Sequence, residues 1–299
     1  IRRELFGEHH PDVASSLGNI ALYTDALGNP RRALELAEQA LAIQRELFGE
    51  RHPDTATALN NVALYTNALG NPRRALELAE QALAIQRELF GERHPSTVNS
   101  LVNIASYTNA LGNTKRALEL AEQALAIQRA LFGEQHSNTA TALNNVASFT
   151  SDLGNPKRAL ELVEQALAIW RELFGEHHPN VAASLGNIAL YTDALGNPRR
   201  ALELAEQALA IRRELFGERH PDTASSLHKM AYYLNLIGKT QQAYAYAQKA
   251  FEIKKEILGA KHPSTLITIK LLSQIKRPGF RMPSGRKIMG KRKKGNSRK

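Results

Sequence analysis

The sequence predicts an all-α protein, a solenoid built from antiparallel helix pairs. The chain is self-similar with a period of 42 residues, and each period contains two segments with helical apolar spacing that a glycine closes. Such a period is typical of arrays in which each unit stacks on the next. The period is carried by seven glycines and seven histidines: Gly7, Gly49, Gly91, Gly133, Gly175, Gly217 and Gly259, and His10, His52, His94, His136, His178, His220 and His262.

The second unit, residues 53–94, illustrates how one helix pair is encoded. Pro53 opens the first segment, and Gly70 ends it at a position where positive φ costs little. Asn71 then supplies an N-cap and Pro72 the first residue of the second segment, which ends at Gly91. The apolar residues are Leu59, Val62, Ala63, Tyr65 and Leu69 in the first segment and Ala75, Leu76, Leu78, Ala79, Ala82, Leu83, Ile85, Leu89 and Phe90 in the second.

A single pair cannot bury so wide an apolar stripe, so neighbouring units are expected to stack and to leave a concave and a convex face. Residues 1–10 match the end of a unit, and we interpret them as the end of a truncated preceding repeat. After the six units we expect one capping helix over 263–276 and a basic, disordered tail over 277–299. The six units are 11–52, 53–94, 95–136, 137–178, 179–220 and 221–262.

Composition excludes several classes of site. The chain has no cysteine, which rules out disulfides, thiolate metal sites and thiol nucleophiles. The net charge of +10 is confined to the tail: residues 276–299 hold 11 of the 39 Lys and Arg, and the other 28 face 29 acids. No phosphate loop, nucleophile elbow or metalloprotease helix appears, so we expect no enzyme and no cofactor. The recurrent histidines are expected to cap helices beside proline and not to bind a metal.

The repeat resembles the tetratricopeptide family. Ile20-Ala21, Gly28, Ala33, Ala37 and Ala40 fall on its leucine, small-residue and glycine positions. The 42-residue length and the Gly-x-x-His-Pro linker are similar to the kinesin-light-chain-like subgroup. This resemblance implies a right-handed superhelix that binds other proteins. The chain departs from the family where an aromatic residue is usual: threonine occupies that slot (Thr24, Thr66, Thr108, Thr150, Thr192), and an aromatic residue precedes it.

An asparagine recurs in the middle of the first helix of five units. Asparagine is a poor residue in a helix interior, which suggests a specific role. In kinesin-light-chain-like arrays the corresponding amide faces the groove and binds the backbone of a bound peptide, so the resemblance implies a peptide-binding groove. The alternative is that the amides bond to the next hairpin and fix the stacking. The predicted groove residues are Asn19, Asn61, Asn103, Asn145 and Asn187, with Leu22, Leu64, Leu190, Asn67 and Asn109 around them.

Two further features concern the second helix of each unit. Trp170 stands in a column otherwise filled by Gln44, Gln86, Gln128 and Arg212, so we expect it to face outward, either as a surface anchor or lying over its own helix. Cations in the first turn of each second helix oppose the helix dipole, and we expect a charge network across repeats to offset this. Partners of this network are predicted at Glu35 and Glu38 one turn on, or at their counterparts in the next unit.

The sequence therefore predicts a cytoplasmic scaffold that binds extended peptide segments of other proteins. An alternative is a nucleic-acid or anionic-lipid binder that acts through the tail residues Lys291, Arg292, Lys293 and Lys294, with a nuclear location. Another is the regulatory repeat region of a larger enzyme or nucleotidase.

Overall fold

The structure is a computed structural model that describes residue 7 and residues 9–275. Within this part of the chain there are thirteen helices and no strand. They form consecutive antiparallel pairs, and each helix packs on its neighbours along the chain. The first helices of the pairs are α2 (Pro11–Ala26), α4 (Pro53–Ala68), α6 (Pro95–Ala110), α8 (Ser137–Asp152), α10 (Pro179–Ala194) and α12 (Pro221–Leu236). The second helices are α3 (Pro30–Phe48), α5 (Pro72–Phe90), α7 (Thr114–Phe132), α9 (Pro156–Phe174), α11 (Pro198–Phe216) and α13 (Thr240–Leu258), and α14 (Pro263–Gln274) follows.

Local capping sets the helix ends as the sequence predicts. In the second unit the side chain of Asn71 accepts a hydrogen bond from the backbone N–H of Arg74 at 3.3 Å. Gly70 has φ +84°, so it turns the chain between α4 and α5 in a conformation that other residues rarely adopt. Gly91 closes α5 with φ +78°. The predicted boundaries of this pair are therefore confirmed.

Small residues allow the close helix packing. Ala75, Ala79 and Ala82 on α5 are completely buried. Four of the five residues in the unusual threonine column are buried, and the hydroxyls of Thr24, Thr66 and Thr150 bond within their own helices: Thr66 Oγ1 donates to the carbonyl oxygen of Val62 at 2.7 Å. A polar side chain is thereby satisfied in the slot where the family usually has an aromatic ring.

The aromatic column packs against the preceding unit. Tyr65 is 2% exposed, whereas the equivalent Tyr23 in the first unit is 69% exposed, because no helix precedes α2 in the described residues. At the other end, α14 packs against α13. It is a single helix at the position where the sequence predicts a cap, and it buries Thr265, Thr268 and Leu271 while Leu266, Ile267 and Ile269 are exposed.

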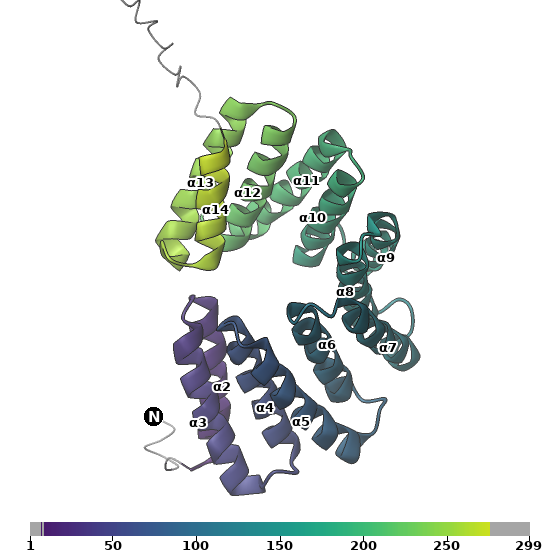
Figure 1. The fold of residues 1–299 in the computed structure, drawn as a ribbon, viewed down its shortest axis with the longest axis vertical. Coiled ribbons are helices and arrows are strands. Elements are labelled where there is room, and N and C mark those ends of the chain that lie inside the picture. Colours follow the sequence, from purple (N-terminus) through teal and green to yellow (C-terminus); the bar gives the residue numbers. More distant parts are fainter. Residues whose placement is uncertain (1–6, 8, 276–299) are drawn as a thin grey trace, which may run out of the picture.

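The units follow an almost closed arc, with the first helices of the pairs toward the inside and the second helices toward the outside (Figure 1). The last helices lie beside the first pair (Figure 1). Gly28, between α2 and α3, is so close to the imidazole of His262 that a Cβ on it would lie 2.8 Å from the ring carbon Cδ2. The two ends of the array thus meet.

Candidate functional site

One stripe of residues on each first helix faces the inside of the arc. Residues i, i+4, i+7 and i+11 share a helix face, and in α2 these are Ser15, Asn19, Leu22 and Ala26. We call this set, with its equivalents in the other units, the inner stripe; all its members are exposed or half-buried. The equivalents are Thr57, Asn61, Leu64, Ala68; Asn99, Asn103, Ser106, Ala110; Thr141, Asn145, Ser148, Asp152; Ala183, Asn187, Leu190, Ala194; and Ser225, Lys229, Tyr232, Leu236.

The inner stripe borders a hollow between the first two units. Asn19 and Leu22 line it from α2, and Asn61 and Leu64 line it from α4. Its volume is about 380 Å³. Four of the residues predicted for the groove are thus brought together on one concave surface.

The amides of Asn19, Asn61, Asn103, Asn145 and Asn187 make no hydrogen bond within the part of the chain that the structure describes. Other asparagines of the same helices do: Asn60 bonds to the next unit and Asn144 to its own helix. Within the described residues, these five amides therefore make no hydrogen bond to the next hairpin, which was the alternative interpretation.

Lys229 replaces the asparagine in the sixth unit. Its ammonium donates a hydrogen bond to the carbonyl oxygen of Gly186 in the fifth unit at 3.2 Å. Burial, and the nearby charge of Arg212, lower the pKa of Lys229 to about 8. This end of the inner stripe therefore carries a cation that is tied to the preceding helix.

The two remaining predicted groove residues lie at the seams between units. Asn67 and Asn109 are half-buried. The amide of Asn109 donates to the carboxylate of Asp152 in the next unit at 3.2 Å. Asn109 therefore helps to hold two units together. Asp152 is an inner-stripe carboxylate that sequence reasoning missed, because the equivalent position is alanine in four of the other five units.

The recurrent histidines begin the first helices. The ring Nδ1 of His94 accepts a hydrogen bond from the backbone N–H of Ser96 at 3.2 Å, and the ring stacks on Phe90 with 4.3 Å between centroids. The same cap occurs at His10, His52, His136, His178, His220 and His262. The predicted capping role is confirmed.

The prediction for Trp170 is wrong. The side chain is 4% exposed and stacks near Phe174 and His178, because the following unit covers this face of α9. The polar residues of the column are covered in the same way: Gln44, Gln86, Gln128 and Lys254 are buried, and Arg212 is half-buried. We call these six residues the seam column.

Each residue of the seam column lies against the residue fourteen positions later in the chain. Gln86 Oε1 accepts from Ser100 Oγ at 2.5 Å, and Ser100 Oγ accepts from the Asn60 amide at 2.7 Å. Lys254 in turn donates to Thr268 Oγ1 at 3.1 Å. In the described residues Gln44 Oε1 and Gln128 Oε1 have no partner, since Ala58 and Ala142 occupy the corresponding positions.

The prediction of a charge network across repeats is wrong for the cations in the first turn of the second helices. Arg32 pairs with Glu35 at 2.6 Å and Arg74 with Glu77 at 2.8 Å, both within one helix. The partner is thus the glutamate one turn further along the same helix, which is one of the two predicted alternatives. The pairs that do join units start from the linkers, for example Arg51 with Glu88 at 3.1 Å.

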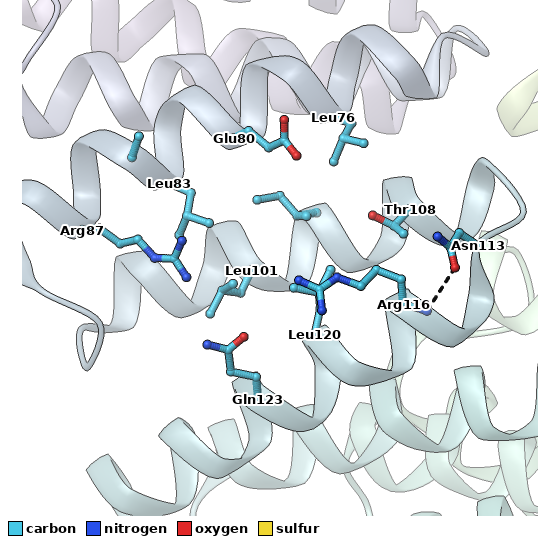
Figure 2. A pocket seen from close by; sticks show the side chains of 12 residues that line it. Leu76, Glu80, Leu83, Arg87, Leu101, Thr108, Asn113, Arg116, Leu120 and Gln123 are labelled. Atoms are coloured by element: carbon cyan, nitrogen blue, oxygen red, sulfur yellow. Dashed lines mark hydrogen bonds between the residues drawn. The ribbon is translucent and has the colours of Figure 1, made fainter.

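A second kind of hollow lies on the outer face. Figure 2 shows the one between α5 and α7, where Glu80 and Arg87 lie across from Arg116 and Gln123. Its volume is about 440 Å³, and a similar hollow of about 400 Å³ recurs one unit on. Its arginines are already engaged, since Arg87 pairs with Glu92 and Arg116 with Glu119, each at 2.8 Å.

No helix in the described residues is long and apolar enough to cross a membrane. The predicted tail site, Lys291 to Lys294, lies outside the described residues.

Comparison with known proteins gives the family. A search of curated proteins found no match. The tetratricopeptide repeat model matches residues 1–46, 28–88, 54–130, 138–214 and 201–256. Among solved structures, the nearly identical TPR-like repeats of a kinesin-light-chain-type protein from Podospora anserina are 29% identical, with 69% of this chain and 97% of that chain covered and a TM-score of 0.56.

Two more distant structures share the fold. BtubC (BKLC) from P. vanneervenii is 24% identical, with 78% of this chain and 91% of that chain covered and a TM-score of 0.59. The Rap protein complexed with competence and sporulation factor is 17% identical, with 87% and 73% covered and a TM-score of 0.62. Because the family matches span most of the sequence and the helix pairs stack as a superhelix, the chain belongs to the tetratricopeptide repeat family and is similar to its kinesin-light-chain-like members.

Proposed function

We propose that this chain is a non-catalytic scaffold whose concave face binds an extended segment of a partner protein. Tetratricopeptide repeats generally mediate protein–protein interactions, and a curved array offers a long concave surface for this purpose. The observation that carries the proposal is the row of inner-stripe amides at Asn19, Asn61, Asn103, Asn145 and Asn187. Their donors and acceptors are not used within the described chain.

An amide suits the main chain of an extended peptide. It offers both a donor and an acceptor, as each peptide unit does, so a row of amides binds a backbone with little regard to its side chains. The exposed leucines beside the row supply apolar contacts. The similar fold of Rap, in complex with competence and sporulation factor, is consistent with this use of the array.

The outer hollow shown in Figure 2 is the competing site, and it is slightly larger. Its cations are compensated by glutamates on the same surface, and Arg116 and Glu119 are both exposed to solvent. A ligand there would have to displace existing ion pairs, whereas a ligand on the inner stripe meets unused amides. This difference favours the concave face.

The proposal is tested by selecting peptides from a displayed random library on the full chain. The selected peptides are then titrated against a variant with Asn61, Asn103 and Asn145 replaced together by alanine. We expect affinity to fall at least about tenfold, because each lost backbone hydrogen bond is worth about 0.5–1.5 kcal/mol.

The matched control replaces Gln81, Gln123 and Gln165, three exposed amides of the second helices, by alanine. It should leave both the affinity and the circular dichroism spectrum unchanged. If the asparagine variant has a native spectrum and binds as well as the original chain, the amides do not hold the ligand and the proposal fails.

A further inference from the structure

The inner stripe changes character along the array. At the position of Leu22, the second and fifth units also carry leucine and the sixth carries Tyr232. These apolar side chains are 40–54% exposed, so they face solvent and are not part of the core. The third and fourth units instead carry exposed serines, Ser106 and Ser148. The array is thus apolar at both ends and polar in its middle.

Closure of the arc joins the two apolar ends. Because Gly28 of the first unit lies against His262 at the end of the sixth, the first and last units lie beside one another across the gap (Figure 1). Units three and four lie on the opposite side of the arc (Figure 1). The enclosed surface therefore has an apolar wall, from units one, two, five and six, that faces a polar wall from units three and four.

The polar wall also carries a negative charge. Asp152, the last inner-stripe residue of the fourth unit, is exposed and accepts a hydrogen bond from Asn109. The inner-stripe cation, Lys229, is half-buried on the apolar wall and already donates to Gly186. A ligand side chain that faces the polar wall therefore meets a carboxylate with acceptor capacity to spare, because a carboxylate has two oxygens and the Asn109 amide bonds to Oδ2.

We propose that the segment bound by this groove is apolar toward both of its ends and has small polar residues in its middle, with a basic residue opposite Asp152. The proposal rests on the proposed function. A segment that follows the asparagine row crosses the six units in order, so its ends lie against the leucines and Tyr232 and its middle lies against Ser106 and Ser148.

The test reads the sequences of the peptides selected on the full chain. We expect apolar residues toward both ends of the selected peptides, with small polar residues and enrichment of Lys or Arg in the middle. A second selection uses a variant with Ser106→Leu and Ser148→Leu, which makes both walls apolar. It should enrich peptides that are apolar throughout.

Affinity for a selected peptide gives an independent readout. Leu64→Ser with Leu190→Ser should weaken binding about tenfold, because two apolar contacts are lost. Leu89→Ser is the matched control, since Leu89 and Leu64 are both 41% exposed but Leu89 lies at the end of a second helix, off the inner stripe. Asp152→Asn should weaken binding of peptides with a basic residue and leave others unchanged.

The outcomes separate the two proposals. Selected peptides that depend on the asparagine row but show no apolar ends and polar middle, and that tolerate Leu64→Ser with Leu190→Ser, would overturn this inference and leave the proposed function standing. If no peptide is selected, or if binding is insensitive to the asparagine row, the proposed function fails and this inference fails with it.

Discussion

Gly28 and His262, which are separated by most of the chain, are in contact where the two ends of the array meet. The contact is specific to this glycine: a Cβ on the equivalent Gly70, Gly112, Gly154, Gly196 or Gly238 would meet nothing within 4 Å. Burial raises the pKa of Asp25 near this contact, and the neighbouring His262 partly offsets that rise. The concave face is therefore enclosed by the array itself.

Gly28→Ala should open the arc, because the added methyl group collides with the His262 ring. Gly196→Ala is the matched control. Gly196 has the same neighbours in sequence as Gly28 and φ +83°, so its replacement by alanine causes the same backbone strain of about 1–2 kcal/mol without a collision. The chain has no native cysteine, so dyes can be attached through Glu38→Cys on α3 and Gln242→Cys on α13. Energy transfer between the dyes should fall for Gly28→Ala and stay unchanged for Gly196→Ala; equal transfer in both variants would contradict the closure.

Ser100→Ala should destabilise the array by about 1–3 kcal/mol, because it leaves the buried Gln86 Oε1 without its donor and the Asn60 amide without its acceptor. Ser184→Ala should cost almost nothing. Ser184 is equally buried, but it faces Trp170 in the seam column and its hydroxyl has no partner in the described residues. Urea unfolding followed by circular dichroism measures both changes, and similar losses in the two variants would argue against the hydrogen-bonded seam.

His94→Ala should lower the free energy of unfolding by about 1 kcal/mol through loss of the cap, with a further loss of the Phe90 stack. His94→Asn restores an acceptor at the N-cap and should recover part of this loss. The same urea experiment compares the three chains. If alanine and asparagine are equally destabilising, the ring is held for its stacking and not for its hydrogen bond.

Stability at the C-terminal end should depend on pH through His228. Burial, with the charges of Lys254 and Lys229, lowers the pKa of His228 from 6.5 to about 4. Between these values the unfolded chain binds a proton that the folded chain does not, so this contribution is fully present above pH 6.5 and is lost as the pH falls through 4. The loss is on the order of 1 kcal/mol, because the ring is partly exposed.

His228→Asn provides the comparison, since asparagine occupies the equivalent position in the second and fourth units. Between about pH 7 and about pH 4.5 the original chain should lose more stability than this variant, measured by urea unfolding. Parallel losses would show that the ring titrates alike in the folded and unfolded chains.

Features that depend only on residues adjacent in the sequence were predictable from it. The caps at Asn71 and Gly70, and the role of His94, follow from local backbone chemistry and were confirmed. Features that depend on how units pack were not. The glutamines and arginine of its column predict a surface position for Trp170, yet the next unit covers that column. The contact between Gly28 and His262 arises from the curvature of the whole array, which no local pattern encodes.

The most direct test of the central claim asks where a selected peptide lies. A photo-crosslinking amino acid is placed at Asn103 on the inner stripe in one chain and at Gln123 in the outer hollow in another. The proposal predicts that the peptide is crosslinked from Asn103 and not from Gln123. Crosslinking from Gln123 alone would contradict it, because the ligand would then occupy the convex face.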